Sequence, residues 1–463
     1  MNNWLYIGLA STLLIIVGLS IWSGRQAKKD TKNSAPVVAG VIMGTLVGGS
    51  STVGTAQLAY QFGMSAWWYT LGAGISCLIL ALVYAKPLRR TGCATLVGII
   101  RKEYGAKTGM AVSVLSSVGT FINVIPQVIA ATAVLAVVFP QMDLTAAVLI
   151  SVIFMILYVI FGGTKAVGII GILKMILIYG TMIVSAVMVL SMVGGLPAFT
   201  RMTLQIADPD GIRFTSIFSR GVGTDIGSCV SVLLGIITTQ TYAQGVLSGR
   251  TDQAAVRGAL ISAFLTPPIG IGGILVGLYM RANAALYTGV TAKTALTTFI
   301  TAHMPPLPAG IILGVLFITV VGTGAGVVMG ISTTLTNDIA AQLIPRFQNP
   351  KTKTTVSRVI LVGILFLAGI LACGPLGDTI LRFTYMSMGL RGAVVFLPLS
   401  CALWLPNRIH TKYAMASVIA GPLTVLLFGL WGILPFEPLF AGVGISLLIM
   451  FVGFWRSKQH LTM

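Results

Sequence analysis

Charged side chains are scarce in this sequence. Asp, Glu, Lys and Arg together make up 8% of its 463 residues, whereas soluble domains carry about 25%. Hydrophobic residues make up 56%. This composition excludes a water-soluble domain of any size, and with it a sensor or receptor that carries a soluble output module. The chain is expected in a lipid bilayer, as a multi-pass protein of the cell (inner) membrane.

Cysteine and histidine are also rare, and neither forms a pattern typical of a metal site. The five cysteines are scattered, mostly within apolar runs, and the three histidines fall in predicted loops. No arrangement of Ser, His and Asp typical of a hydrolase is visible. We therefore expect neither an enzyme nor a protein that holds an organic cofactor.

Long apolar runs dominate instead. A spanning helix needs roughly 20 apolar residues, and this length predicts about thirteen spans. We expect one membrane domain over 1–463, with an extra N-terminal span at 4–23, a core at 36–405 and two C-terminal spans at 411–455. The first span is expected to be retained, because no basic region precedes it and no small-residue cleavage site follows it. The predicted spans are 4–23, 36–62, 66–86, 108–139, 143–162, 164–194, 220–247, 254–281, 306–336, 357–374, 379–405, 411–433 and 436–455.

The basic residues are distributed unevenly. The formal net charge is +19, which alone would also suit a protein that binds nucleic acid. Most Lys and Arg residues, however, fall in alternate predicted loops, such as 86–107, 346–358 and 408–412, and the opposite loops hold few. This positive-inside pattern predicts an outside N-terminus and a cytoplasmic C-terminus. The expected partners are a small-molecule solute and the lipid bilayer, with no nucleic acid and no obligate protein partner.

Two apolar stretches contain more Gly, Ser and Thr than a simple spanning helix needs. One is "LVGGSSTVGTAQLAYQFG" at 46–63, and the other is "GVGTDIGSCVSVLLGIITTQ" at 221–240. They lie in the second and seventh predicted spans, which is the spacing of an inverted repeat of five helices plus five. In such transporters the first helix of each repeat is broken near the membrane midplane, where it borders a polar cavity. The alternative is a face of small residues that lets helices pack closely.

Several segments resemble the sodium/solute symporter family, which includes the proline, pantothenate and sugar symporters. "GGSSTVGTAQLAYQFGMSAWW" resembles the first core helix of that family, and "GVVMGISTTLTNDIAAQL" resembles its SS-x-LT-x-DI signature. Three more segments match in order: "FGGTKAVGIIGILK", "TTQTYAQGVLSGRTDQAAVRGALI" and "YMSMGLRGAVVFLPLSCALW". The resemblance implies an all-α polytopic membrane protein with a LeuT-like core of ten helices in two inverted halves.

The resemblance also implies a sodium site between the first and eighth core helices. Its ligands would be the backbone carbonyls of Gly44, Val47 and Met329 and the hydroxyls of Ser332 and Thr333. Neutral oxygens suit sodium, a hard cation, so this site would need no acidic residue. Alternatively, the Ser and Thr side chains only bond back to carbonyls of their own helix.

The solute site is expected beside the two breaks. Candidates from the first, third and sixth core helices are Gly49, Ser50, Ser51, Thr52, Asn123, Gln127, Asp225, Ser228 and Ser231. Gln127 could instead join helices by hydrogen bonds. Asp225 could serve only to cap the outer end of its helix.

Arg391 stands near the middle of the eleventh predicted span, where the family pattern has a small residue. A central arginine costs at least about 2.5 kcal/mol on insertion scales and needs a partner or a wet cavity. We expect its guanidinium to meet an anionic group of the solute, with a carboxylate favoured because it suits two parallel hydrogen bonds. The alternative is a structural pair with Asp225 or with carbonyls of a broken helix.

Lys174 departs from the family pattern. Aligned from Gly162 and Gly163, the segment places Gly171 where the family has an aspartate and Lys174 where it has a glutamine. Lys174 then lies roughly 10 residues, or about 15 Å, into its span. Some carriers with the LeuT-like fold that do not use sodium place a basic side chain from this fifth core helix at the sodium position. An ammonium there could stand in for sodium, and could gain and lose a proton in each cycle.

Together these features predict a secondary active transporter that works by alternating access. Sodium-coupled symport of a small organic solute is the expected function, with Na⁺ as the coupling ion. The alternative is a proton-coupled or ion-independent carrier in which Lys174 replaces the sodium. A channel is less favoured because no span shows a regular polar stripe. A membrane scaffold is less favoured because it would need neither broken helices nor a buried arginine.

Overall fold

The protein is helical in the computed structural model. The structure describes residues 3–26, 33–161, 164–206, 211–287, 289–374, 380–431 and 437–461. Within these ranges the only strand-like pairing is an isolated bridge between Asn33 and Gly249. Gly162 and Gly163, from which the segment of Lys174 was aligned, lie outside the described residues.

Nine helical segments of the described residues are long and apolar enough to cross a membrane, and a bent pair would make a tenth. Three shorter apolar helices accompany them, among them Asn3–Ile16 and Leu144–Tyr158. The all-helical membrane fold is confirmed. The count of about thirteen spans and the orientation of the termini stay predictions.

The second predicted span is broken, as its Gly and Ser content predicted. Helix α2 (Ala35–Leu46) is capped by Val47, and α3 (Val53–Phe62) begins after Thr52. The glycines between them let the backbone approach its neighbours closely. A Cβ atom at Gly48 would lie 2.3 Å from the hydroxyl oxygen of Thr323, and one at Gly49 would lie 2.5 Å from the methyl group of Ala130.

The seventh predicted span is broken as well. Helix α12 (Val222–Thr238) and helix α13 (Gln240–Leu247) meet at an angle of 51°. Thr239 between them has an extended backbone, with φ −88° and ψ 122°. The two breaks therefore occur in the two helices for which an inverted repeat predicts them.

The other helices of the core surround these two. Helix α17 is the central one, because 89% of its most apolar stretch is buried, whereas the corresponding value for α10 and α19 is 28%. The helices are α4 (Trp67–Ile79), α5 (Ala85–Arg90), α7 (Ala106–Ile122), α8 (Val124–Val138), α9 (Leu144–Phe161), α10 (Thr164–Val193), α14 (Asp252–Leu265), α15 (Pro267–Ala282), α17 (Pro306–Thr334), α19 (Pro350–Ala372) and α20 (Ile380–Trp404).

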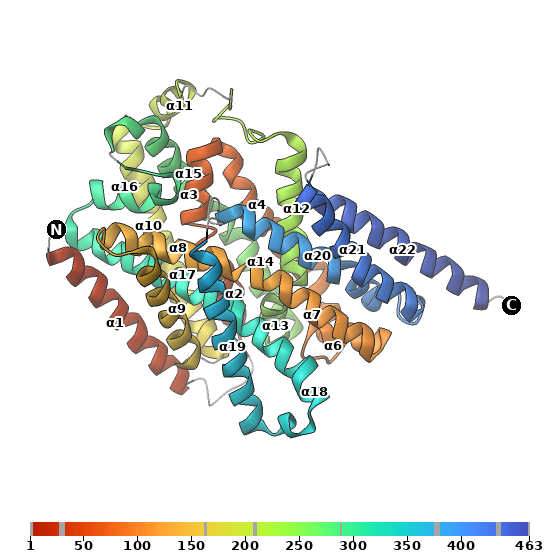
Figure 1. The fold of residues 1–463 in the computed structure, drawn as a ribbon. Helices are drawn as coiled ribbons and strands as arrows, with labels where there is room; N and C mark the ends of the chain where they lie inside the picture. Colours follow the sequence, from red (N-terminus) through yellow and green to blue (C-terminus); the bar gives the residue numbers. More distant parts are fainter. Residues whose placement is uncertain are drawn as a thin grey trace.

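Further helices lie on the flanks and at the ends. Figure 1 shows α1 (Asn3–Gln26) on one flank and α21 (Thr411–Trp431) with α22 (Pro438–Leu461) on the opposite one. Short helices α11 (Leu196–Leu204) and α16 (Ala295–His303) lie at one end, here called the outer end. Helices α6 (Leu96–Tyr104) and α18 (Ala341–Leu343) lie at the other, the inner end. The charge pattern predicts that the inner end is cytoplasmic.

Candidate functional site

Polar side chains from α8 and α20 hold the first break. The side-chain oxygen of Gln127 accepts a hydrogen bond of 3.1 Å from the backbone N–H of Gly49, and its amide nitrogen donates one of 3.2 Å to the Ser50 hydroxyl. Ser50 also shares a hydrogen bond of 2.8 Å with the hydroxyl of Thr384. All of these groups are buried. Buried polar groups are costly unless paired, so this network fixes the break against its neighbours.

The remaining hydroxyls of the first break bond locally. Ser51 accepts from the N–H of Gly48 at 2.9 Å, and Thr52 donates to the carbonyl of Gly48 at 2.7 Å. Of the three predicted hydroxyl residues, Ser50 is the one whose side chain reaches other helices. Asn123 lies buried at the junction of α7 and α8, and its side-chain oxygen has no hydrogen-bond partner among the described residues.

Lys174 reaches the first break from α10. Its ammonium donates a hydrogen bond of 2.7 Å to the carbonyl oxygen of Gly44 and one of 3.4 Å to the hydroxyl of Thr323. Thr323 in turn donates to the carbonyl of Val47 at 3.1 Å. Lys174 is 2% exposed. Lys174 forms no ion pair with another described residue, so its charge lies against neutral oxygens at the end of α2.

The predicted sodium ligands are not brought together. Gly44 and Val47 lie at the first break, but Ser332 donates to the backbone of Ser357 in α19, at 2.6 Å, and Thr333 bonds back to the carbonyl of Met329 at 2.7 Å. Ser332 is nine residues beyond Thr323 on α17, which is roughly 13 Å along a helix. The structure therefore does not bring Met329, Ser332 and Thr333 to Gly44 and Val47, and the sodium site stays a prediction. In this structure Thr323 makes the contact of α17 with the break.

The hydroxyl of Thr323 contacts the first break, which was not predicted from the sequence. Thr323 occurs in "VVGTGAG", within the most buried part of α17. The glycines on either side leave room for neighbours. A Cβ atom at Gly322 would lie 3.1 Å from the ammonium of Lys174. A lone hydroxyl between two glycines in a central helix is the signal that could have identified it.

Arg391 lies at the second break. Its guanidinium donates a hydrogen bond of 2.7 Å from Nη1 to the hydroxyl of Thr239 and one of 3.2 Å from Nε to the carbonyl of Ser387. The residue is 1% exposed, and its Nη2 has no partner in the described part of the chain. A buried arginine with an unpaired N–H donor can bind an anionic group of a ligand.

The space for the side chain of Arg391 comes from a glycine. A Cβ atom at Gly119 in α7 would lie 2.8 Å from Cγ of Arg391. Beside the second break is a small cavity of ≈ 20 Å³, enough for about one water molecule. Its polar lining residues are Ser116, Ser117, Thr120, Thr238, Thr239, Gln240, Thr241 and Thr334.

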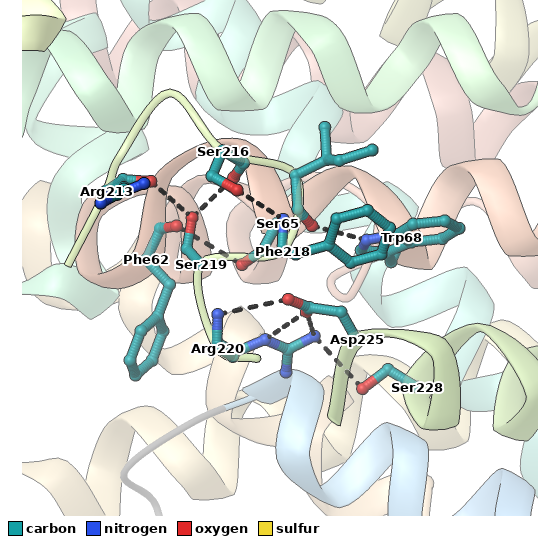
Figure 2. A network of polar contacts seen from close by, with 11 residues as sticks. Phe62, Ser65, Trp68, Arg213, Ser216, Phe218, Ser219, Arg220, Asp225 and Ser228 are labelled. Atoms are coloured by element: carbon teal, nitrogen blue, oxygen red, sulfur yellow. Dashed lines mark hydrogen bonds and ion pairs between the residues drawn. The ribbon is translucent and has the colours of Figure 1, made fainter. Parts of the chain in front are cut away.

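Asp225 and Ser228 belong to a different cluster, at the outer end of α12. Figure 2 shows the guanidinium of Arg220 against the carboxylate of Asp225, at 2.6 Å, and against the hydroxyl of Ser228, at 3.2 Å. The backbone N–H of Arg220 also donates to Asp225, at 3.2 Å. In this structure Asp225 thus pairs with Arg220 and not with Arg391.

Ser231 faces a larger cavity near the outer end. This cavity has a volume of ≈ 580 Å³, which is within the usual range of ligand pockets. Arg220, Tyr385 and Gly389 line it together with Ser231. Leu390 of α20 also lines this cavity and is the neighbour of Arg391 in the chain. Of the predicted solute residues, Ser50, Gln127 and Arg391 thus lie at the breaks, and Asp225, Ser228 and Ser231 lie toward the outer end.

Comparisons with known proteins agree with this architecture. A sequence profile of the "Sodium:solute symporter family" matches residues 34–421. The human high affinity choline transporter 1 is 24% identical over 438 residues, which cover 88% of this chain and 74% of the relative. The sodium/pantothenate symporter of Escherichia coli (strain K12) is 23% identical over 471 residues, which cover 96% of this chain and 95% of the relative.

Solved structures show the same fold. A Na⁺-coupled sialic acid symporter, in a substrate-bound outward-open state, superposes with a TM-score of 0.78 at 16% identity. The superposition covers 98% of this chain and 97% of the symporter. Mhp1, a transporter of the nucleobase-cation-symport-1 family, superposes with a TM-score of 0.57 at 12% identity, over 93% of this chain and 94% of that transporter. The LeuT-like fold is thereby confirmed.

Proposed function

Because this chain belongs to the sodium:solute symporter family, we propose that it carries a small organic solute with an anionic group across the membrane, by alternating access and in symport with sodium. It is a multi-pass membrane transporter and not an enzyme. The observation that carries the proposal is the pair of broken helices, each with buried polar groups that are held by other core helices.

Arg391 supports the anionic class of solute. Its buried guanidinium has a free Nη2, and no carboxylate pairs with it in the described residues. A positive charge in this position is costly until an anion arrives, so the site favours solutes that bring one. Among the similar proteins, pantothenate and sialic acid symporters are named for carboxylates and the choline transporter for a cation. A buried arginine disfavours the cation.

Binding in detergent would test this proposal. The purified protein would be screened by thermal shift against carboxylates, amino acids, sugars and choline, with and without sodium. We expect a carboxylate to raise the melting temperature of the wild type but not of Arg391→Gln. Arg456→Gln, which alters an exposed arginine at the inner end, is the matched control. A stabilising solute without negative charge, bound equally by Arg391→Gln, would remove Arg391 from the site.

The coupling ion has a second candidate, because of Lys174. Its ammonium already lies against the carbonyl of Gly44 and the hydroxyl of Thr323, which are ligands of the kind a sodium ion would use. In this second form of the proposal, Lys174 stands in for sodium, and the carrier is proton-coupled or ion-independent. Uptake into proteoliposomes with a sodium gradient or a proton gradient, imposed separately, would decide between the two candidates.

A further inference from the structure

At the inner end, hydrogen bonds join segments that are far apart in the sequence. The cavity beside the second break measures ≈ 20 Å³, enough for about one water molecule. If the solute is exchanged with both sides, as the proposed function requires, contacts at the inner end must open. The residues that close this end can be identified from their hydrogen bonds.

One such contact joins the segment before α2 to the turn between α13 and α14. The backbone N–H of Asn33 donates to the carbonyl of Ser248 at 2.9 Å, and the backbone N–H of Arg250 donates to the carbonyl of Asn33 at 2.8 Å. The side-chain amide of Asn33 donates to the hydroxyl of Ser248 at 2.9 Å. Asn33 is 4% exposed. These three bonds tie the start of the inner half-helix α2 to the turn.

A second contact joins the same turn to α5. Arg89 donates from Nε to the carboxylate of Asp252 at 2.7 Å and from Nη1 to the carbonyls of Leu247 and Gly249. Leu247 is the last residue of α13, Gly249 lies in the turn that follows, and Asp252 is the first residue of α14. Arg89 therefore fixes the turn to the helix that follows α4.

The two contacts differ in the kind of bond that they make. The bonds of Arg89 are charge-assisted and share one planar group, whereas those of Asn33 join neutral groups. In addition, the side-chain oxygen of Asn33 is buried without a partner in the described part of the chain. Helix α2 is connected to α3 only through residues 47–52, which are not helical. A rotation at these residues would free α2 without deforming a continuous helix.

We propose that Asn33 is the inner latch of the transport cycle. Its bonds to Ser248 and Arg250 break when the site opens at the inner end, while Arg89 keeps the α13–α14 turn attached to α5. The proposal rests on the proposed function, because it assigns the contact that alternating access must open. Asn33 touches no residue of either break through these bonds and acts by positioning α2.

Thiol labelling tests the latch without a transport assay. In a variant without native cysteines, Thr241→Cys places a reporter in the small cavity beside the second break, where Thr241 is 2% exposed. Asn33→Ala should raise the rate at which N-ethylmaleimide labels this cysteine by about fivefold, as expected for the loss of one hydrogen bond. Asn349→Ala, which removes an asparagine cap from α19 at the same end, is the matched control. A rate unchanged by Asn33→Ala would overturn the proposal.

Cross-linking provides the second test. The variant Asn33→Cys/Ser248→Cys would be treated with a short bifunctional methanethiosulfonate and assayed for uptake of the solute found by thermal shift. We expect the cross-link to abolish uptake, reduction with dithiothreitol to restore it, and both single variants to stay active. Normal uptake by the cross-linked protein would show that Asn33 and Ser248 do not separate. If labelling responds to Asn33→Ala but no solute is carried at all, the latch stands and the proposed function fails.

Discussion

The ammonium of Lys174 lies 2.7 Å from the carbonyl oxygen of Gly44. Gly44 is in the last turn of α2, which ends at Leu46. The last carbonyls of a helix lack intrahelical partners, and the helix dipole makes this end negative. The first break therefore attracts a cation, and in this chain a side chain from α10 supplies one. This contact links the coupling ion to the position of the half-helix that the Asn33 latch controls.

Removing this ammonium should change the response of transport to sodium. Lys174→Ala would leave the carbonyl of Gly44 and the hydroxyl of Thr323 without their partner, so sodium could bind them without competition. We expect sodium to stimulate uptake by Lys174→Ala at lower concentrations than uptake by the wild type. Uptake into proteoliposomes, measured against sodium concentration at fixed pH, gives the comparison.

The matching variant is Lys174→Ala/Thr323→Val, which keeps the shape of residue 323 but removes its hydroxyl. It should lose the added sensitivity to sodium. If Lys174→Ala and the wild type show the same dependence on sodium, the carbonyl of Gly44 is not a cation site. If the wild type ignores sodium and only Lys174→Ala responds, the candidate in which Lys174 replaces sodium is supported.

Gln127 should be needed to hold the first break in place. Gln127→Leu would leave the N–H of Gly49 and the hydroxyl of Ser50 without a bond that each makes in the wild type. The N–H of Gly49 is then left unsatisfied, at a cost of about 1–3 kcal/mol, whereas the hydroxyl of Ser50 keeps its bond to Thr384. Thermal melting in detergent should show this loss. Thr132→Val, at a buried residue of the same helix that only bonds back to Ile129, should melt close to the wild type. A Gln127→Leu protein as stable as that control would contradict the proposed network.

The sequence allowed the two breaks to be located because Gly and Ser are unusual within apolar spans, and repeated spacing reinforced the interpretation. Lys174 and Arg391 stood out for the same reason, because charge within a span is costly. The partners of α17 could not be found in this way. Ser332 and Thr323 are both hydroxyl residues on one apolar helix, and only the packing of α17 against α2 and α19 determines which one meets the break. Similarly, Asp225 was expected at the site as a polar residue of the sixth core helix. Its pairing with Arg220 was not predicted, because Arg220 lies in a loop whose path cannot be predicted from composition.

Acidification should weaken the packing of α16 at the outer end. His303, the last residue of α16, lies half-buried among Tyr279, Tyr287 and Phe299, and it shares a hydrogen bond of 2.6 Å with the hydroxyl of Tyr287. Burial lowers the pKa of His303 below its usual value of 6.5. The folded state therefore binds the proton less readily than the unfolded state, so this residue reduces stability as the pH falls below 6.5.

The measurement is thermal melting in detergent between pH 7.5 and pH 5. We expect the melting temperature of the wild type to fall over this interval by more than that of His303→Gln, which has no titratable group at this place. His410→Gln, at an exposed loop residue, should behave like the wild type. If the melting temperatures of the wild type and of His303→Gln fall equally with pH, His303 does not contribute to the pH dependence of stability.

Gly119 should determine whether Arg391 can take its position. A Cβ atom at Gly119 would lie 2.8 Å from Cγ of Arg391 and 3.4 Å from its backbone nitrogen, so Gly119→Ala must displace the arginine side chain from Thr239. A displaced guanidinium would lose a charge-assisted hydrogen bond to the bound carboxylate. The loss of one such bond, about 1.5–3 kcal/mol, corresponds to a fall in affinity of about tenfold or more. Gly180→Ala in α10 has no heavy atom within 4 Å of its new Cβ, and it should bind the carboxylate like the wild type. Both variants can be compared by titrating the thermal shift with the carboxylate that stabilises the wild type. Because Gly119→Ala leaves Arg391 chemically intact, weaker binding would assign the effect to the position of the guanidinium, and unchanged affinity would show that the anion is bound elsewhere.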